Sequence, residues 1–134
     1  MFECANYDLC NSRYNTQLKR WERDGFGVQQ DQDGSIYEGQ FEKNRKNGIG
    51  RVRFTNGDVY QGQFANDKSN GQGLFIDSDG SVYEGEWLDD AQHGVGREEW
   101  QGGAVTFEGT YAYSKKNGRG RFEWADGSYY DGEM

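Results

Sequence analysis

The stretch "GSVYEGEW", residues 80 to 87, places Gly85 between Tyr83 and Trp87, two aromatic residues on the same side of any strand that contains them. A glycine in the middle of a strand costs backbone entropy and supplies no side chain, so a single case would indicate a bulge or a close approach. The same pattern recurs as "YEGQF" (37–41), "YQGQF" (60–64), "FEGTY" (107–111) and "YDGEM" (130–134). The stretch therefore belongs to an internal repeat, which decides the fold.

The repeat has two further landmarks, which recur every 23 residues. A G-x-G pair precedes each aromatic stretch, and these pairs begin at Gly25, Gly48, Gly71, Gly94 and, one residue late, Gly118. Asp-Gly or Asn-Gly stands between the two landmarks, at 33–34, 56–57, 79–80 and 126–127, and is the strongest short-range hairpin signal. In the fourth unit "QGGA" (101–104) takes this place, and we expect a turn there that holds the extra residue. The sequence thus predicts five hairpins, in units 25–47, 48–70, 71–93, 94–117 and 118–134.

Polar segments of six residues are expected to link the hairpins, as in "EKNRKN" (42–47) and "ANDKSN" (65–70). Most of them end in Asn before Gly, which suits left-handed backbone. His93 fills the place of this Asn in one unit and is the only histidine. We therefore interpret it as a turn residue with left-handed backbone.

The composition of the chain predicts a thin fold. Of its 134 residues only 33% are hydrophobic and the mean hydropathy is -1.12, which argues against a thick two-layer core. Aromatic residues nevertheless reach 16%, and disordered chains are poor in this class. A single sheet stabilised by a row of rings satisfies both observations.

The net charge excludes one class of partner. A formal charge of -8 repels phosphate backbones, so no nucleic acid is expected, and anionic membranes are disfavoured for the same reason. Cys4 and Cys10 are the only cysteines, and no signal peptide or membrane-length apolar run is recognisable. We expect a cytoplasmic protein with both thiols free.

Two hairpin registers compete, because a two-residue loop and a three-residue loop with a glycine bulge differ by one position. The three-residue loop places Tyr60 and Phe64 on one face with Val52, and leaves Arg51 and Arg53 on the other. This separation is the cleaner one. It also sets Gly73 opposite Gly85 and Phe75 opposite Tyr83, so that rings can lean over bare backbone.

The N-terminal residues 1–24 admit two interpretations. Counting back one period from "GSIYEGQF" (34–41) reaches "NSRYNTQL" (11–18), a degenerate copy that would act as a capping repeat. Alternatively, residues 7–21 form a short helix, since apolar residues recur there at helical spacing. With the degenerate copy included, the sheet would have eleven or twelve strands.

Units 48–70 and 71–93 closely resemble MORN repeats (membrane occupation and recognition nexus), with G-x-G, an Asp-Gly or Asn-Gly turn, and Y-x-G-x-F/W. The resemblance covers residues 25–134 well; the fourth unit departs from it by its insertion and by Phe107, and the last unit ends at Met134 where Phe or Trp would stand. It implies an all-β fold, an elongated single twisted antiparallel sheet of successive β-hairpins.

The resemblance also implies a non-catalytic role. MORN proteins act as scaffolds in cilia, cytoskeletal assemblies and membrane contact structures, and phospholipid binding is often attributed to the repeat. The function expected here is a structural module for protein–protein interaction in a larger intracellular assembly, in a cilium or the cytoskeleton, with a peripheral phospholipid-binding adaptor as the alternative. We expect no enzyme and no cofactor.

Two sets of residues are candidate contacts. The aromatic binding face would hold a helix or strand of a protein partner, unless the rings pack against one another and the sheet closes over them; it comprises Tyr37, Phe41, Tyr60, Phe64, Tyr83, Trp87, Phe107, Tyr111, Phe122, Trp124 and Tyr130. The basic residues Lys43, Arg45, Lys46, Lys115 and Lys116 are the candidates for phospholipid head groups, although so few cations would bind weakly. The C-terminal sheet edge offers a second place for a partner strand or for a homodimer.

Other chemistry-like features have simpler explanations. Glu38, Glu84, Glu108 and Asp131 are copies of one repeat position, so they should stand roughly 9 to 10 Å apart on a solvated face, too far for paired carboxylate catalysis. "DQDGS" (31–35) and "DSDGS" (77–81) resemble the start of a calcium loop but lack its later ligands, and we expect hairpin turns. No catalytic residue and no metal site is predicted.

Overall fold

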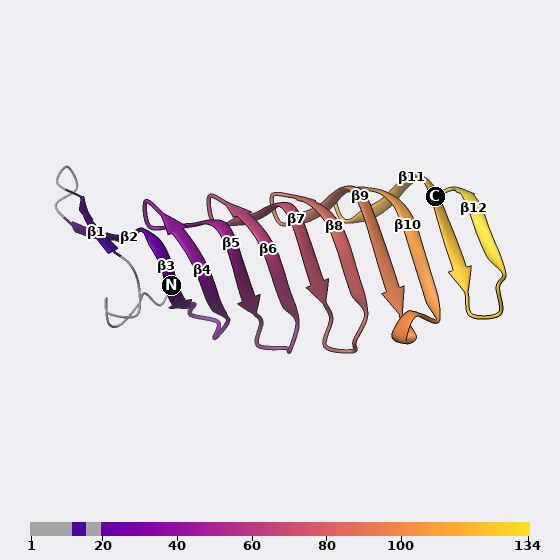
Figure 1. Cartoon of the computed structure of the whole chain (residues 1–134), viewed down its shortest axis with the longest axis horizontal. Helices are drawn as coiled ribbons and strands as arrows, with labels where there is room; N and C mark the ends of the chain where they lie inside the picture. The colour runs from indigo at the N-terminus through magenta and orange to yellow at the C-terminus, as the bar shows by residue number, and fades with distance from the viewer. Residues whose placement is uncertain (1–11, 16–19) are drawn as a thin grey trace.

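The computed structural model describes residues 12–15 and 20–134, which form one long open sheet and a separate small hairpin (Figure 1). The long sheet has ten strands, β3 to β12, in chain order, and every neighbouring pair is antiparallel. The described residues contain no α-helix. This confirms the predicted all-β array of hairpins, although the long sheet has ten strands rather than eleven or twelve.

The strands are short and evenly spaced. Their bounds are β1 Ser12–Asn15, β2 Arg20–Arg23, β3 Gly25–Gln30, β4 Ile36–Glu42, β5 Arg45–Arg53, β6 Val59–Ala65, β7 Lys68–Ile76, β8 Val82–Leu88, β9 Ala91–Trp100, β10 Val105–Ala112, β11 Lys115–Trp124 and β12 Tyr129–Glu133.

The N-terminal hairpin β1–β2 forms its own two-stranded sheet, in which Tyr14 pairs with Trp21. Within the predicted helix 7–21, the described residues are therefore strands. The remaining residues of that range, and both cysteines, lie outside the described part of the chain, and a capping role for residues 1–24 stays a prediction.

The Asp-Gly and Asn-Gly loops have the predicted three residues. In the first of them, Gly34 N–H donates to Asp31 O at 3.0 Å and Asp31 N–H donates to Ser35 O at 2.9 Å. Gly34 has a φ of 96°, the left-handed backbone that this loop requires. In the fourth unit the loop is one residue longer and contains the short 3-10 helix η2 (Gln101–Gly103), which confirms the turn expected there.

The links between hairpins are shorter than predicted. Strand β5 begins at Arg45, which pairs with Glu42, so only Lys43 and Asn44 form the turn, and both have positive φ. The six-residue linkers of the sequence analysis are thus two-residue turns followed by paired strand. The prediction for His93 is wrong too: the left-handed residues near it are Asp89, Asp90 and Gly94, whereas His93 lies within β9.

The two-residue turns of the second and third units are each held by the strand that follows the preceding turn. Asp67 N–H donates to Lys46 O at 3.0 Å, and Lys46 N–H donates to the Asp67 side chain at 2.9 Å. Asp90 and Ser69 repeat these two contacts one unit later, at 3.0 and 2.8 Å. Each of these turns is thereby linked to the preceding unit, beyond the strand pairing itself.

A bulge interrupts the strand pairing between each hairpin and the next, at the G-x-G landmark. Between β6 and β7 the register shifts after Gly62, and Gly71 has a φ of 95°. The backbone N–H of Gln72, which the bulge takes out of the ladder, donates to the side-chain oxygen of Gln63 at 2.6 Å. Gln40 and Glu86 make the equivalent bonds, to Ile49 N–H and Val95 N–H, both at 2.7 Å. In these units, the residue before the second aromatic residue of the Y-x-G-x-F/W pattern therefore accepts a hydrogen bond from the backbone N–H that the bulge leaves without a strand partner.

The strand register matches the prediction. Gly73 pairs with Gly85, Phe75 with Tyr83 and Val52 with Tyr60. One face of the sheet therefore carries the aromatic residues, and we call it the aromatic face. The rings lie over glycine as expected, because a Cβ atom at Gly96 would meet the ring carbons of Tyr83, and one at Gly85 would meet the Tyr83 hydroxyl.

Candidate functional site: a groove on the aromatic face

The rings of the aromatic face form a continuous chain of edge-to-face contacts. Within a unit, the Tyr83 and Trp87 ring centroids are 5.3 Å apart at 87°, and between units Tyr83 and Tyr111 are 5.1 Å apart at 89°. The contacts between Tyr60 and Phe64 and between Tyr60 and Trp87 repeat this geometry at 5.1 and 5.2 Å. Such pairs each contribute about 0.5–1.5 kcal/mol beyond area burial, so the row is the core of the fold.

Most of the predicted binding face is therefore not accessible. Seven of the eleven residues are buried: Tyr37, Phe41, Tyr60, Phe64, Tyr83, Phe107 and Tyr111. For these seven, the alternative in which the rings pack against one another holds, because neighbouring rings and long side chains cover them. Trp87 and Phe122 are half-buried, while Trp124 and Tyr130 are exposed; contact of these four with a partner stays a prediction.

The tyrosine hydroxyls of the core are satisfied by the backbone. Tyr60 and Tyr83 donate to the carbonyl oxygens of Gln63 and Glu86, both at 2.8 Å. Burial raises the pKa of Tyr60 and of Tyr83 to about 12. Burial also raises the pKa of Tyr111, whose hydroxyl donates to Glu98 at 2.5 Å. These tyrosines are structural groups at neutral pH.

Two lysines cover parts of the aromatic row. Lys46 pairs with Phe41 across β4 and β5, and its Nζ lies 5.4 Å from the Tyr37 ring centroid and 3.6 Å from Asp31. Lys116 repeats the arrangement in the fourth unit: its Nζ lies 5.1 Å from the Phe107 centroid and 3.1 Å from a Glu98 oxygen.

The positions of Lys46 and Lys116 reduce the number of basic residues that remain candidates for phospholipid contact. Lys46 and Lys116 face the rings and are ion-paired, so they are not the free surface cations that were expected. Lys43, Arg45 and Lys115 are exposed. Their contact with head groups stays a prediction.

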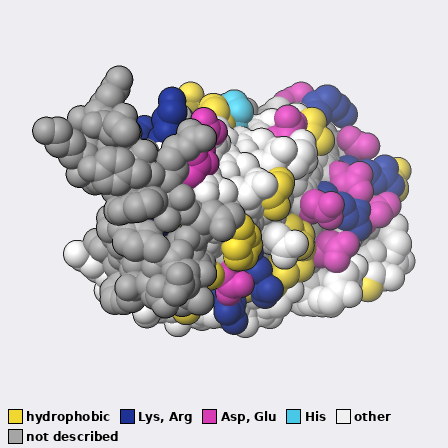
Figure 2. All heavy atoms as spheres, turned by 60° about the vertical axis from the view of Figure 1, so that its left-hand side comes forward, with side chains coloured by type: hydrophobic (Ala, Val, Ile, Leu, Met, Phe, Trp, Pro, Cys, Tyr) yellow, Lys and Arg dark blue, Asp and Glu magenta, His cyan; other side chains and the backbone are white. Residues whose placement is uncertain are grey.

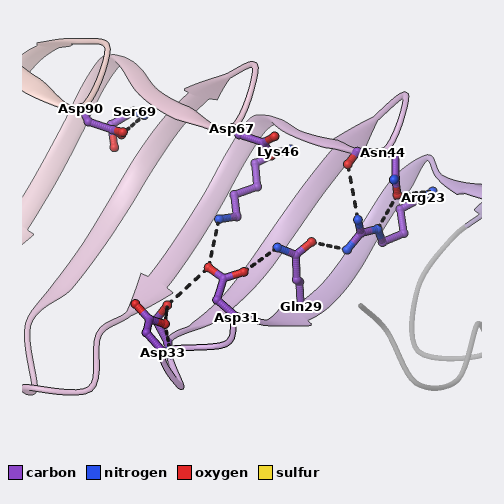
Figure 3. A network of polar contacts seen from close by, with 10 residues as sticks. Arg23, Gln29, Asp31, Asp33, Asn44, Lys46, Asp67, Ser69 and Asp90 are labelled. Atoms are coloured by element: carbon purple, nitrogen blue, oxygen red, sulfur yellow. Dashed lines mark hydrogen bonds and ion pairs between the residues drawn. The ribbon is translucent and has the colours of Figure 1, made fainter. Parts of the chain in front are cut away.

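A polar network crosses the N-terminal end of the aromatic face (Figure 3). Arg23 donates to the Asn44 side chain at 2.7 Å and also to Gln29, whose amide donates to Asp31 at 2.8 Å. Asp31 in turn meets Lys46. Asp31 is thus bound by an amide from β3 and an ammonium group from β5.

A groove opens on the aromatic face where this cover ends, next to Lys46. It has a volume of about 380 Å³, and its apolar lining is Val52, Phe54, Tyr60, Phe64, Phe75 and Trp87. Its rim carries four carboxylates, Asp31, Asp33, Asp67 and Asp90, and one ammonium group, that of Lys46. A larger depression of about 590 Å³ lies between Asp24 and Gly48 but is lined mostly by polar groups and backbone. The first groove is therefore the candidate site for an apolar, positively charged ligand.

The opposite face carries the repeated carboxylates, and they lie among cations. Glu38 is 3.0 Å from Arg53, Glu108 meets Arg97, and Asp131 is 3.4 Å from Arg119. Basic and acidic side chains are mixed on the side that Figure 2 shows, next to exposed hydrophobic ones. This is the arrangement of a solvated strand face.

The calcium-like loops are hairpin turns. Asp33 accepts from Ser35 N–H at 2.9 Å and from the Ser35 hydroxyl at 2.7 Å, and these bonds lower the pKa of the Asp33 carboxyl. Asp79 makes the same pair of bonds with Ser81. Among residues 12–15 and 20–134 there is no cluster of ligands able to hold a metal, and no helix long and apolar enough to cross a membrane.

Fold and face together define a β-hairpin repeat protein with an aromatic core on one side of an open sheet. The model of the MORN repeat matches residues 22–36, 37–59, 60–82, 83–105 and 107–129. The chain therefore belongs to the MORN-repeat family. This family consists of repeat modules often involved in protein or membrane interaction, and it is generally non-catalytic. A comparison with curated proteins gave no significant match.

Proposed function

We propose that this chain is a non-catalytic scaffold module that holds a protein partner on its aromatic face, within a larger intracellular assembly. The groove next to Lys46 carries the proposal, because its apolar lining reaches the surface beside a charged rim. Phe54, in this lining, is 39% exposed. Grooves of this size that combine an apolar lining with placed polar groups are typical binding sites.

The charge of the groove favours a protein over a phospholipid. Four carboxylates against one ammonium group give its rim a negative field, which repels anionic head groups. The same sign holds for the whole chain, with a net charge of -8. A basic or neutral protein segment meets neither obstacle.

Site-specific photo-crosslinking in cells tests the proposal. A photoreactive phenylalanine analogue at position 54 reports the groove, and the same analogue at Ile49 reports the opposite face, where that residue is 56% exposed. We expect discrete protein crosslinks from position 54 and few from position 49. Equal patterns at the two positions, or lipid adducts alone at position 54, would contradict the proposal.

The second candidate function is a peripheral phospholipid-binding adaptor, which Lys43, Arg45 and Lys115 favour because all three are exposed. At roughly 1 kcal/mol for each basic residue near an anionic membrane, the attraction is small. Flotation with phosphatidylserine vesicles at physiological salt tests it, with Lys43→Glu and Arg45→Glu together as the variant. Flotation that this variant abolishes would place the adaptor first.

The edge strand β12 is a further candidate contact, because in the described sheet it pairs only with β11. Strand addition or a homodimer at this edge would satisfy its free backbone groups. Sedimentation analysis over a concentration series tests self-association. Localisation to a cilium or the cytoskeleton rests on the family resemblance, and imaging of the tagged full-length protein in a ciliated cell tests it.

A further inference from the structure

One position in each unit lies across the sheet from the second aromatic ring of the repeat. These positions, which we call the cover positions, are Lys46 opposite Phe41, Ser69 opposite Phe64, Gln92 opposite Trp87, and Lys116 opposite Tyr111. At two of these positions, Lys46 and Lys116, the side chain extends over rings of its own unit. The cover positions therefore decide how far each part of the aromatic row is closed.

The two lysines at cover positions behave alike. The ammonium group of Lys46 stands over Tyr37 and ends at Asp31, and that of Lys116 stands over Phe107 and ends at Glu98. A cation over an aromatic face is worth more where water is excluded, and a lysine stem covers apolar surface while its charge reaches a carboxylate. The chain thus places a cation over the first ring of two units.

Ser69 holds the cover position in the unit between Lys46 and Gln92. Its side chain is short, and the groove of about 380 Å³ lies beside it, with the half-buried rings of Phe75 and Trp87 in its lining. The groove therefore adjoins the cover position that a lysine occupies in two other units.

The carboxylates around Ser69 suit a cation. Asp90 accepts from Ser69 N–H through Oδ1 at 2.8 Å, and Asp67 accepts from Lys46 N–H through Oδ1 at 2.9 Å. Within the described part of the chain, no hydrogen bond to Oδ2 of Asp67 or Asp90 is seen. Figure 3 shows Asp90 beside Ser69 at the end of the network, while Lys46 is directed to Asp31. The rim thus has more negative charge than its own lysine balances.

We propose that the groove at Ser69 receives a lysine side chain from a protein partner, with its stem along Phe75 and Trp87 and its ammonium group near Asp90. The incoming lysine places its charge at a rim carboxylate, as Lys46 and Lys116 do in their own units. This inference rests on the proposed function and adds the chemistry that the partner must present. An arginine shares the stem and charge and is the nearest alternative side chain.

A peptide titration followed by NMR tests the inference directly. The probe is a capped nine-residue peptide of alanine and leucine with one central lysine, and the reporters are the Ser69 amide and the Trp87 indole N–H, which donates to Gly73 O at 3.1 Å. We expect saturable shifts at both reporters, and affinity about tenfold lower when the lysine is replaced by norleucine. Equal binding of the norleucine peptide, or no saturable shift at all, would overturn the inference.

The chain offers a matched pair of variants. Ser69→Lys fills the groove with the chain's own cation, and Gln61→Lys adds the same charge at an exposed site on the opposite face. We expect Ser69→Lys to lower affinity for the lysine peptide about tenfold or more, and to keep or raise the melting temperature, since two units already hold a lysine there. Gln61→Lys should leave the affinity within about twofold, because surface charges are screened.

A third variant keeps the inference testable if Ser69→Lys does not fold. Asp90→Asn keeps the oxygen that accepts from Ser69 N–H but removes the charge, and we expect several-fold weaker binding of the lysine peptide. Unchanged binding in both Ser69→Lys and Asp90→Asn would overturn the inference. Crosslinks from position 54 that persist while the peptides fail would contradict only the lysine pocket, whereas missing crosslinks would contradict the proposed function itself.

Discussion

Gly85 lies under the ring of Tyr83 and directly against the backbone of the next strand. A Cβ atom at this position would stand 2.6 Å from Gly96 Cα, 2.6 Å from Val95 O and 2.8 Å from the Tyr83 hydroxyl oxygen. The first two of these are backbone atoms of a paired strand, which cannot move without opening the ladder. The glycine is therefore required by a close approach from two directions.

Substitution of Gly85 by alanine should be strongly destabilising. We expect the free energy of unfolding to fall by about 3 kcal/mol, the upper range for overpacking a tight site. Gly132→Ala in β12 is the matched control, because its nearest neighbours are atoms of the Tyr130 ring, 47% exposed and able to swing away. Its cost should stay below about 1 kcal/mol. Urea denaturation measures both, and equal costs would contradict the close-approach explanation.

The glutamine before the second aromatic has a role that a nearby glutamine lacks. Gln63→Leu removes the side-chain oxygen that accepts from Gln72 N–H and should cost about 1 kcal/mol. Gln61→Leu, two residues earlier on the same exposed face, loses no such bond and should change stability by less than about 0.5 kcal/mol. Chemical denaturation compares the two; a larger loss for Gln61→Leu would contradict the role given to the bulge.

At the scale of the strand pair, the sequence predicted the features that depend on neighbouring residues and recur in every unit. The three-residue loops follow from Asp-Gly and Asn-Gly, and the face of each strand follows from the alternation of rings, glycines and charges. The two-residue turns did not follow, since Lys43 is not a residue that local propensity would place in left-handed backbone, and the Asn before each Gly offered a competing left-handed position. Their partners lie in the preceding unit, so a contact distant in sequence decides their conformation.

The burial of the rings could not be predicted from the sequence pattern either. The alternation showed that the rings share a face, but it could not distinguish an exposed row from a closed one. The direction of the Lys46 and Lys116 side chains decides this, and polar segments between hairpins gave no sign that they turn inward. A cation opposite the second ring of a unit is the signal that could have been used.

The tyrosine row predicts a sensitivity to alkaline pH. Folding raises the pKa of Tyr60 and Tyr83 from 10.0 to about 12, so the unfolded chain releases these protons first. Stability is therefore complete below about pH 10 and falls as the pH rises toward 12, by about 1 kcal/mol for each tyrosine between pH 10 and 11. Urea titrations at a series of pH values measure this slope.

Tyr83→Phe is the control for the alkaline slope. Phe107 stands at the equivalent place of the fourth unit, so the ring should fit, at a cost of about 1 kcal/mol for the lost bond to Glu86 O. The variant should then lose less stability than the wild-type protein between pH 10 and 11. An unchanged slope would show that Tyr83 is not protected as described.

At the scale of the whole molecule, each strand of the array contacts mainly its immediate neighbours. Ten strands in chain order give no crossover that could link distant units. Arrays of this kind have nearly one-dimensional energetics, in which a defect affects adjacent repeats most.

Hydrogen exchange of Gly85→Ala tests this one-dimensional behaviour. We expect the amide protons of β8 and β9 to lose the most protection and those of β3 and β4 to lose the least, because the clash lies between β8 and β9. A uniform loss across the sheet would instead indicate a single cooperative unit.

The central claim is that a ring of one strand lies over the glycines of that strand and the next. Nuclear Overhauser contacts in isotope-labelled protein test it most directly. We expect strong contacts between the Tyr83 ring protons and the Hα protons of Gly85 and Gly96, with both Hα signals shifted upfield by the ring. Contacts from the Tyr83 ring to the Val95 side chain, which lies on the other face, would contradict the account.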